Sequence, residues 1–408
     1  MSDRVVITGI GILCGFGVGK AIFWDRLLAG DSALRLVDKW AAELEHPVII
    51  ATIPEFSAKD VLPKLRPPHP SRYCQLALFA TSLALKDARL DLQMMSPSRI
   101  GTVLNTDYGP NEMVEQYLTA LFLRGPATAS PLLFSRTVGN VAIGDVARYF
   151  QLKGPSTMLF GEHSLCYAYD LLQDDRADVI LCGGLDELRP SILWSYEQLG
   201  LVLSHDAYTV VEATRPYHRG SVGMALGEAA AILVLERLDH ALGRGATIYA
   251  EVLGYATGAD ALSNYALPTR DSGSILRTME QAVRAADAAT LPIELVIGAA
   301  SSHWPHGEAE LRACAELGRD SPPGVIGIKG AIGETFGSSG SMGTATGALF
   351  LHTGQVPSRY MEPDTRWPSV NRMLGGRPYR SGARCLCNSI HLGGNNSSVL
   401  LSSWSRTD

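Results

Sequence analysis

A lysine and a glutamate separated by four residues stand in the glycine-rich stretch IKGAIGETFGSSGSMG, residues 328–343. The side chains of Lys329 and Glu334 are of the kinds that carry acid–base chemistry. The glycines around them are typical of a backbone that comes close to another group. Two hypotheses follow. Either the chain is an enzyme with unusual acid–base chemistry, or it has the fold of an enzyme that no longer performs chemistry.

Two further stretches contain reactive side chains. GPSTMLFGEHSLCYAYDLL, residues 154–172, holds His163 and Cys166 after a Gly-Pro turn, and SHWPHGEAEL, residues 302–311, holds His303 and His306. A histidine can act as an acid or a base, and a cysteine is a nucleophile when its thiol is ionised. Cys166 falls inside a predicted helix, where an ordinary buried thiol is the simpler interpretation.

The motifs of other site classes are absent from the sequence. The seven cysteines are scattered among apolar residues, which predicts reduced, buried thiols of a cytosolic protein. Cys385 and Cys387 stand too close for a common zinc knuckle and have no second pair. The glycines of residues 9–17 lack a convincingly placed acidic partner for a dinucleotide site, and there is no Walker or G-x-S-x-G motif. We therefore expect neither a cofactor nor a metal.

Alternating apolar strands and helices must position these side chains, which indicates an α/β fold with sheets covered on both faces. Ser71 is a plausible N-cap of a long buried helix over 71–90, and the first strand, 4–8, is expected to end at Gly9 and Gly11. Other strands are predicted at 99–106, 177–184, 294–301, 324–330 and 398–404, and other helices at 272–288 and 341–356. The pattern repeats, which predicts two similar halves, 1–245 and 246–408, in one compact five-layered body.

Composition excludes several classes of protein. Of the 408 residues, 46% are apolar and 19% charged, which is too apolar for a disordered chain. The net charge of −6 gives no electrostatic reason to expect nucleic acid as a partner. An early acidic residue argues against a signal peptide, and no apolar run reaches the roughly 18 residues of a membrane helix. We expect a cytoplasmic protein without a membrane span.

Six motifs, in the right order from about residue 4 to residue 402, resemble β-ketoacyl synthases, the condensing enzymes of fatty-acid and type II polyketide synthesis. They are VVITGIG (5–11), GPS (154–156), ADVILCGG (177–184), residues 224–255, IKGAIGETFGSSGSMG and HLGGNNSSVLL (391–401). The resemblance implies the thiolase fold, a duplicated βαβαβαββ unit with α-β-α-β-α layers, and a dimer.

The resemblance also implies three catalytic positions, and all three are changed here. Active members use a cysteine at the start of a buried helix as the nucleophile, and two histidines that stabilise the enolate. An ungapped count puts His163 at the nucleophile position, and a count from the following strand puts it near Met158. Ser301 stands at the first histidine position and Glu334 at the second. An ionised carboxylate would repel the enolate oxygen rather than donate to it.

Other family positions are kept. Lys329 is retained, and the resemblance implies that it forms a structural ion pair with Glu310. Gly393, Gly394 and Asn395 match the glycine loop that lines the active site, and Leu392 takes the place of the usual gatekeeper phenylalanine.

This chain resembles the chain length factors of type II polyketide synthases, including those of aryl-polyene-type systems, which are ketosynthase-like chains without the cysteine. The resemblance implies a heterodimer with an active ketosynthase, an acyl carrier protein that bears the growing chain, and a shared acyl tunnel. The tunnel or interface candidates are Tyr108, Met113, Phe134 and Val138. Two alternatives stay open: an atypical acyl-transferring or decarboxylating enzyme that uses Cys166, His163 or Glu334, and a homodimeric acyl-binding scaffold.

Overall fold

The computed structural model describes residues 4–38, 40, 44–55, 62, 70–161, 163–202, 214–218, 220–221, 223–260, 271–286, 292–319, 322–357, 382–391 and 393–405. Leu392, the predicted gatekeeper position, lies outside the described residues. Within the described part, no helix is both long and apolar enough to span a bilayer.

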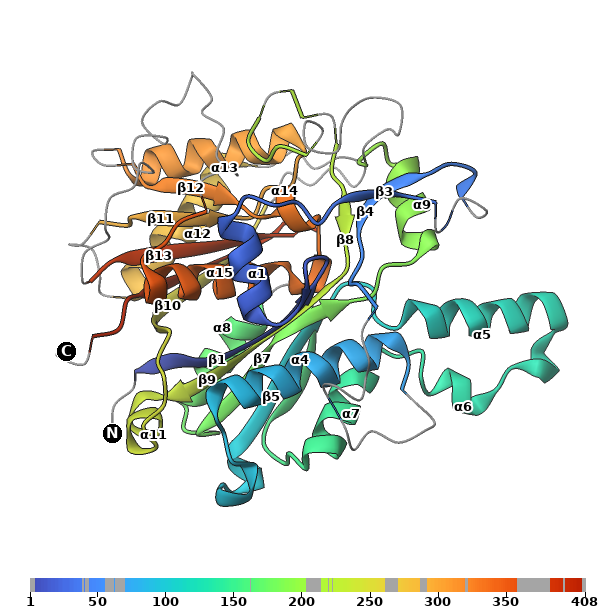
Figure 1. The fold of residues 1–408 in the computed structure, drawn as a ribbon, viewed down its shortest axis with the longest axis horizontal. Helices are drawn as coiled ribbons and strands as arrows, with labels where there is room; N and C mark the ends of the chain where they lie inside the picture. The colour runs from blue at the N-terminus through green and yellow to red at the C-terminus, as the bar shows by residue number, and fades with distance from the viewer. Residues whose placement is uncertain are drawn as a thin grey trace.

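Two sets of five strands form the centre of the molecule (Figure 1). The first set is, in spatial order, β6 (Ser156–Phe160), β5 (Ile100–Thr106), β7 (Val179–Asp186), β9 (Ala229–Arg237) and β1 (Val5–Cys14). The second is β12 (Gly324–Gly327), β11 (Leu295–Gly298), β13 (Arg384–Ile390), β14 (Asn395–Ser402) and β10 (Ala250–Ala259). In each set the second strand is parallel to its two neighbours, and the remaining pairs are antiparallel.

The chain order of the elements is the same in both sets. β1-α4-β5-α7-β6-α8-β7-β9 corresponds to β10-α12-β11-α13-β12-α15-β13-β14. The helices are α4 (Arg72–Ala88), α7 (Val141–Phe150), α8 (Ser164–Gln173), α12 (Ser272–Ala285), α13 (Trp304–Leu317) and α15 (Ser339–Thr353). The two sets join where β1 pairs with β10 at Val5 to Ile7. The predicted duplicated βαβαβαββ fold is thereby confirmed.

Helices cover both sets in layers (Figure 1). The apolar faces of α8 and α15 share one core with strands of both sets, so these two helices form the central layer. Helix α4 packs with α7 on the outer face of the first set, and α12 with α13 on the outer face of the second. The central layer places the N-termini of α8 and α15 between the sheets, where the predicted catalytic positions fall.

The first strand is longer than the sequence predicts. β1 does not end at Gly9 and Gly11 but continues through them to Cys14. A Cβ atom on Gly11 would lie 2.0 Å from the carbonyl oxygen of Ala80, so these glycines allow α4 to pack directly on the strand. The predicted cap of α4 is confirmed, because the Ser71 hydroxyl accepts from the amide of Cys74.

Smaller elements complete the fold. An additional sheet consists of β3 (Arg35–Val37), β4 (Val48–Ala51) and β8 (Leu226–Gly227), and β2 (Gly17–Val18) pairs with β1. The remaining helices are α1 (Lys20–Leu28), α5 (Asn111–Arg124), α6 (Pro131–Phe134), α9 (Pro190–Gln198), α11 (Leu238–Gly243) and α14 (Lys329–Ile332). Short 3₁₀ turns are η1 (Leu92–Met94), η2 (Pro97–Arg99), η3 (Pro126–Thr128) and η4 (Phe336–Ser338).

Helices α5 and α6 project from the body (Figure 1). We call residues 111–134, which include α5, η3 and α6, the arm. Only Ala120 is buried among the 14 residues of α5. Because helices of this length gain most of their stability from a packed face, the arm is exposed to an unusual degree.

Candidate functional site

The predicted nucleophile position lies at the start of α8. His163 is the N-cap residue of that helix, whereas Met158 lies inside β6. The His163 ring is partly buried, and its Nδ1 atom is buried without a hydrogen-bond partner among the described residues. Burial, followed by the neighbouring His391, lowers the pKa of His163. The ring is therefore neutral at pH 7.

Cys166 is the third residue of α8 and does not reach the helix end. It is buried, and with Cys182 and Cys387 it lines a cavity of about 10 Å³. Burial raises the pKa of the Cys166 thiol well above its ordinary value. A thiol in this environment stays protonated and is a poor nucleophile. All seven cysteines are buried and free, as predicted.

The first histidine position holds a hydroxyl group. Ser301 follows β11 and is buried. The neighbouring His303 is the N-cap residue of α13, and its ring centroid lies 5.0 Å from that of His306 in the first turn of that helix. These two histidines thus contact each other at the start of α13. Burial lowers the pKa of His303.

The second histidine position holds a charged pair. The Lys329 ammonium donates to Glu334 Oε2 at 2.8 Å, and Glu334 Oε1 accepts from the Ser339 hydroxyl at 2.6 Å. Gly333, at φ +78°, turns the chain so that the glutamate faces back toward the lysine. Burial alone would raise the pKa of Glu334, but the lysine and the hydrogen bonds hold it below its ordinary value. Glu334 is therefore an ionised acceptor and not a donor.

Glu334 was not predicted as a partner of Lys329. Among the described residues, Lys329 contacts the carboxylate of Glu334, whereas Glu310 accepts hydrogen bonds from other groups. Its donors are the backbone amides of Ala299 and Ala300, the Tyr217 hydroxyl and the Asn388 side-chain amide. Glu310 thus ties the ends of β11 and β13 together. The ion pair between Glu310 and Lys329 stays a prediction, and the structure shows Glu334 as a partner of the lysine.

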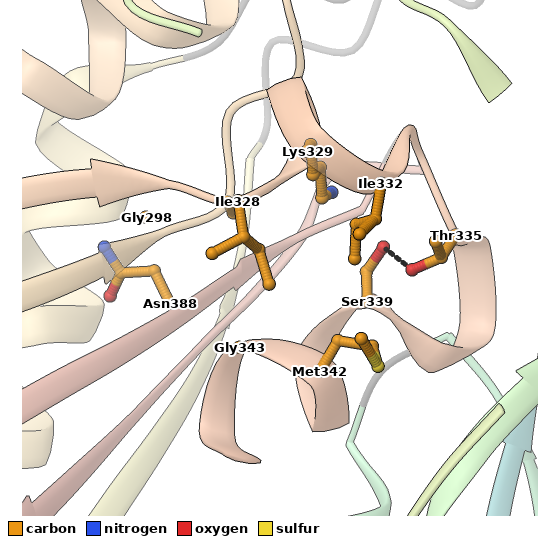
Figure 2. A pocket seen from close by; sticks show the side chains of 10 residues that line it. Gly298, Ile328, Lys329, Ile332, Thr335, Ser339, Met342, Gly343 and Asn388 are labelled. Atoms are coloured by element: carbon orange, nitrogen blue, oxygen red, sulfur yellow. Dashed lines mark hydrogen bonds between the residues drawn. The ribbon is translucent and has the colours of Figure 1, made fainter. Parts of the chain in front are cut away.

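A small pocket lies beside this pair (Figure 2). Its lining comes from α14, the start of α15 and the ends of β11 and β13, and includes Lys329, Ser339, Met342 and Asn388. Figure 2 shows the Thr335 and Ser339 hydroxyls in contact on one side, at 3.2 Å. The cavity volume is about 10 Å³, roughly the room that one water molecule needs. An acyl chain does not fit in this space.

A contact between Asp107 and His391 was not predicted. His391 Nε2 lies 3.0 Å from Asp107 Oδ2, and His391 Nδ1 accepts from the amide of Gly393 at 3.1 Å. The accepting Nδ1 places the proton of the neutral ring on Nε2, which donates to Asp107. Because both ring nitrogens are engaged, His391 is held in one tautomer. Asp107 follows β5 and His391 follows β13, so no local sequence pattern could have joined them.

Tyr108 belongs to an aromatic cluster beneath Glu334. Its hydroxyl lies 2.7 Å from that of Tyr196, and its ring meets Phe336 edge-on with the centroids 5.0 Å apart. Phe336 is buried and has φ +53°, a left-handed conformation that a bulky residue rarely adopts. Burial, with a smaller contribution from nearby acidic groups, raises the pKa of both tyrosines, so both hydroxyls remain protonated. The cluster closes this side of the site with packed rings.

The other predicted tunnel residues lie on the arm or beside it. Met113 is in the first turn of α5, and Phe134 ends α6, where its ring centroid lies 5.5 Å from that of Tyr117. Phe134 is 55% exposed and Val138 44% exposed. The structure does not bring these side chains together with Glu334 or His163. In the predicted glycine loop, Gly394 has φ +90° and Asn395 begins β14.

The chemistry open to this site is limited. It has no thiol at the helix start, and a serine and an ionised glutamate replace the two imidazole donors. Among the described residues, no group of three or more His, Cys, Asp or Glu side chains is placed to hold a metal ion. The site can bind polar groups through Lys329 and Ser339.

Known proteins resemble this chain in sequence and in fold along most of its length. A 3-oxoacyl-[acyl-carrier-protein] synthase 2 of Rhizobium meliloti (strain 1021) is 30% identical over 422 residues, covering 98% of both chains. The tetracenomycin polyketide synthase ketoacyl synthase alpha subunit of Streptomyces glaucescens is 30% identical over 378 residues, covering 88% of both. The solved structure of the ishigamide ketosynthase/chain length factor has a TM-score of 0.87 at 24% identity, covers 99% of this chain, and so shares its fold.

The family models match nearly all of the sequence up to residue 360. The model "Beta-ketoacyl synthase, N-terminal domain" matches residues 2–241, and "Beta-ketoacyl synthase, C-terminal domain" matches residues 249–360. Together with the thiolase-like fold, these matches show that the chain belongs to the β-ketoacyl synthase family.

Proposed function

We propose that this chain is a chain length factor, a ketosynthase-like subunit without condensing activity of its own. It pairs with an active β-ketoacyl synthase that elongates a chain carried by acyl carrier protein. The observation that carries the proposal is the ion pair between Lys329 and Glu334 at the second histidine position. A fixed carboxylate at this position repels an enolate oxygen, where an active enzyme places a hydrogen-bond donor.

The rest of the site supports the same reading. His163 occupies the start of α8, and Cys166 lies inside the helix as a protonated, buried thiol. Ser301 cannot supply the charge or the reach of an imidazole. One altered position could belong to a variant mechanism. Three altered positions remove the nucleophile and both electrostatic stabilisers together.

An exposed apolar surface supports a partner subunit. The arm exposes Phe122 by 77%, Leu123 by 80% and Leu132 by 82%, and Phe160 at the end of β6 is exposed by 72%. Exposed apolar patches of this kind mark protein–protein interfaces. β6 is also the outermost strand of its set and presents a free edge for pairing. We call this combined surface of arm and β6 the arm surface, and we assign the active ketosynthase to it.

The relatives support the choice of partner. One solved relative is described as a ketosynthase/chain length factor, and a relative with 30% identity is the alpha subunit of a polyketide synthase. In the proposed complex, Tyr108, Met113, Phe134 and Val138 contribute this chain's share of a common acyl tunnel. Because His163, and not a cysteine, stands at the start of α8, the growing chain starts from the partner's cysteine.

Co-expression with an intact ketosynthase from the same genome tests the proposal. The two chains are expected to co-purify at equal stoichiometry, and condensing activity is expected only when the partner's cysteine is intact. Phe122→Asp should weaken the complex at least tenfold, because a charge would be buried in the interface. Met94→Asp is the matched control, since Met94 is 83% exposed on η1, outside the arm surface. Equal loss in both variants, or no complex at all, would refute the proposed partnership.

A second candidate function rests on the unpartnered Nδ1 atom of His163. A neutral imidazole at the nucleophile position could accept an acyl group from a thioester, with the thiol as the leaving group. This would make the chain an acyl-transferring enzyme. A transient acyl adduct that disappears in His163→Ala, in the chain purified without a partner, would favour this candidate over the first.

A further inference from the structure

We infer that Asp186 and Glu187, adjacent at the end of β7, are positioning residues that fix the base of the arm and the loop beside Glu334. The inference rests on the proposed function, because the arm carries the surface to which the partner is assigned. Neither residue touches the three altered catalytic positions. Both are buried, and both are used as hydrogen-bond acceptors by segments far away in the sequence.

Asp186 accepts hydrogen bonds from two segments, the end of β5 with the loop that follows it and η4. Its carboxylate accepts five hydrogen bonds: from the Thr106 hydroxyl (2.6 Å) and the backbone amides of Asp107 (2.9 Å), Tyr108 (3.1 Å), Gly109 (3.2 Å) and Gly337 (2.9 Å). The first four donors belong to the connection from β5 to the arm. The fifth belongs to η4, directly after Glu334. A single carboxylate thus ties the start of the arm to the turn that holds the altered catalytic glutamate.

The end of β5 and η4 are also closely packed against each other. A Cβ atom on Gly337 would lie 2.6 Å from Thr106 Cα and 2.9 Å from Asp186 Oδ2, so the two segments are already in direct contact. Gly109 has φ +72°, and its amide also reaches the Thr106 hydroxyl at 2.9 Å. The chain therefore turns into α5 with its amides already aimed at Asp186.

Glu187 and its neighbours hold the first turns of α5. Glu187 Oε1 accepts from the amide of Glu112 at 2.7 Å, an amide at the helix start that has no partner within the helix. Arg189 donates two hydrogen bonds to Glu115, at 2.6 and 2.9 Å, and the Ser191 hydroxyl donates to the same carboxylate. Because α5 buries only Ala120 elsewhere, its direction is set mainly at this base.

Burial of these two carboxylates is unfavourable, and their hydrogen bonds to backbone amides offset part of that cost. Burial and the nearby Asp107 raise the pKa of Asp186 to about 7, although the hydroxyl and amide donors oppose the rise; Tyr73 of α4 and Tyr108 also face it. Burial raises the pKa of Glu187 to about 7 as well; Glu112 and Glu228 face it with like charge, and Arg189 and Arg72 with opposite charge. An apolar side chain would avoid this cost but would leave the amides unpaired.

Amide hydrogen exchange of the full chain tests the inference without any partner. Glu187→Ala should raise exchange at the start of α5 at least tenfold, and Glu187→Gln should restore protection, because its amide oxygen accepts the same bond. Asp186→Ala should raise exchange at residues 107–109 and 337, and Asp186→Asn should raise it less. Glu251→Ala is the matched control, because Glu251 is a buried carboxylate that pairs with Arg4 away from the arm. Unchanged exchange at the arm base would overturn the inference.

Partner binding supplies the second readout. Asp186→Ala and Glu187→Ala should each lower the affinity for the ketosynthase at least tenfold. Glu187→Gln and the control Glu251→Ala should leave that affinity unchanged. Altered exchange with unchanged affinity would overturn the positioning role. If the wild-type chain binds no ketosynthase, the proposed function fails, and the exchange measurements still decide whether these residues fix the arm.

Discussion

At the scale of single residues, the pair formed by Lys329 and Glu334 holds the turn between α14 and η4 in shape. Removing the lysine would leave a buried carboxylate without its cation, which typically costs roughly 3–5 kcal/mol. We predict that Lys329→Met lowers the thermal unfolding midpoint by several degrees. The double variant Lys329→Met/Glu334→Leu should recover most of the loss. An unchanged midpoint in the single variant would show that the pair has no structural role.

The pH dependence of this pair has a definite sign. The pKa of Glu334 is lower in the folded chain than the ordinary value of 4.5. Its contribution to stability is therefore fully present above pH 4.5 and is lost as the pH falls through the folded value. Urea unfolding at pH 6 and at pH 4 should show a smaller difference between the two pH values in Glu334→Gln than in the wild type. Equal differences would contradict this assignment.

The motifs predict which residues stand at the family's catalytic positions, and the structure places His163 at the start of α8, Ser301 after β11 and Glu334 after α14. The contact between Lys329 and Glu334 was not predicted, since it depends on the positive φ of Gly333, which turns the chain between the two residues. The contact between Asp107 and His391 could not be predicted from the sequence either. It depends on two strand ends that meet only in the folded sheets.

At the scale of elements, repeated strand–helix patterns predicted the duplicated fold because buried strands and amphipathic helices follow different periods. The predicted end of β1 was wrong, since glycines that permit close packing look the same in a sequence as glycines that end a strand. The arm was not predicted as a unit. Its apolar residues have the spacing of an ordinary packed helix, and only the structure shows that α5 buries almost none of them.

The end of β7 gives a prediction with the opposite sign to that of Glu334. The pKa values of Asp186 and Glu187 rise from 3.8 and 4.5 to about 7 on folding. The folded chain then binds more protons than the unfolded chain between about pH 4 and pH 7, so these groups lower stability as the pH rises through that window. The effect is on the order of a few kcal/mol.

Urea unfolding over this window checks the sign. The double variant Asp186→Asn/Glu187→Gln should lose less stability than the wild type between pH 5 and pH 8. Parallel pH profiles for the two proteins would mean that neither carboxylate changes its protonation state on folding.

At the scale of the whole molecule, the proposed complex sets product length through residues on and beside the arm. We predict that Met113→Ala or Phe134→Ala, in complex with the active ketosynthase, lengthens the product, because trimming a side chain at a tunnel end opens volume. Mass spectrometry of the products measures this directly. Met94→Ala is the control outside the arm surface. Products of the same length from every variant would remove these residues from the tunnel.

The central claim is that this chain carries no acyl group, and intact mass spectrometry of the complex tests it most directly. After incubation with acyl-loaded acyl carrier protein, the acyl group should appear on the partner ketosynthase and be lost when the partner's cysteine is replaced. The mass of this chain should stay unchanged throughout. Stoichiometric acylation of this chain, abolished by Cys166→Ala or His163→Ala, would contradict the account and make the chain an acyl-transferring enzyme.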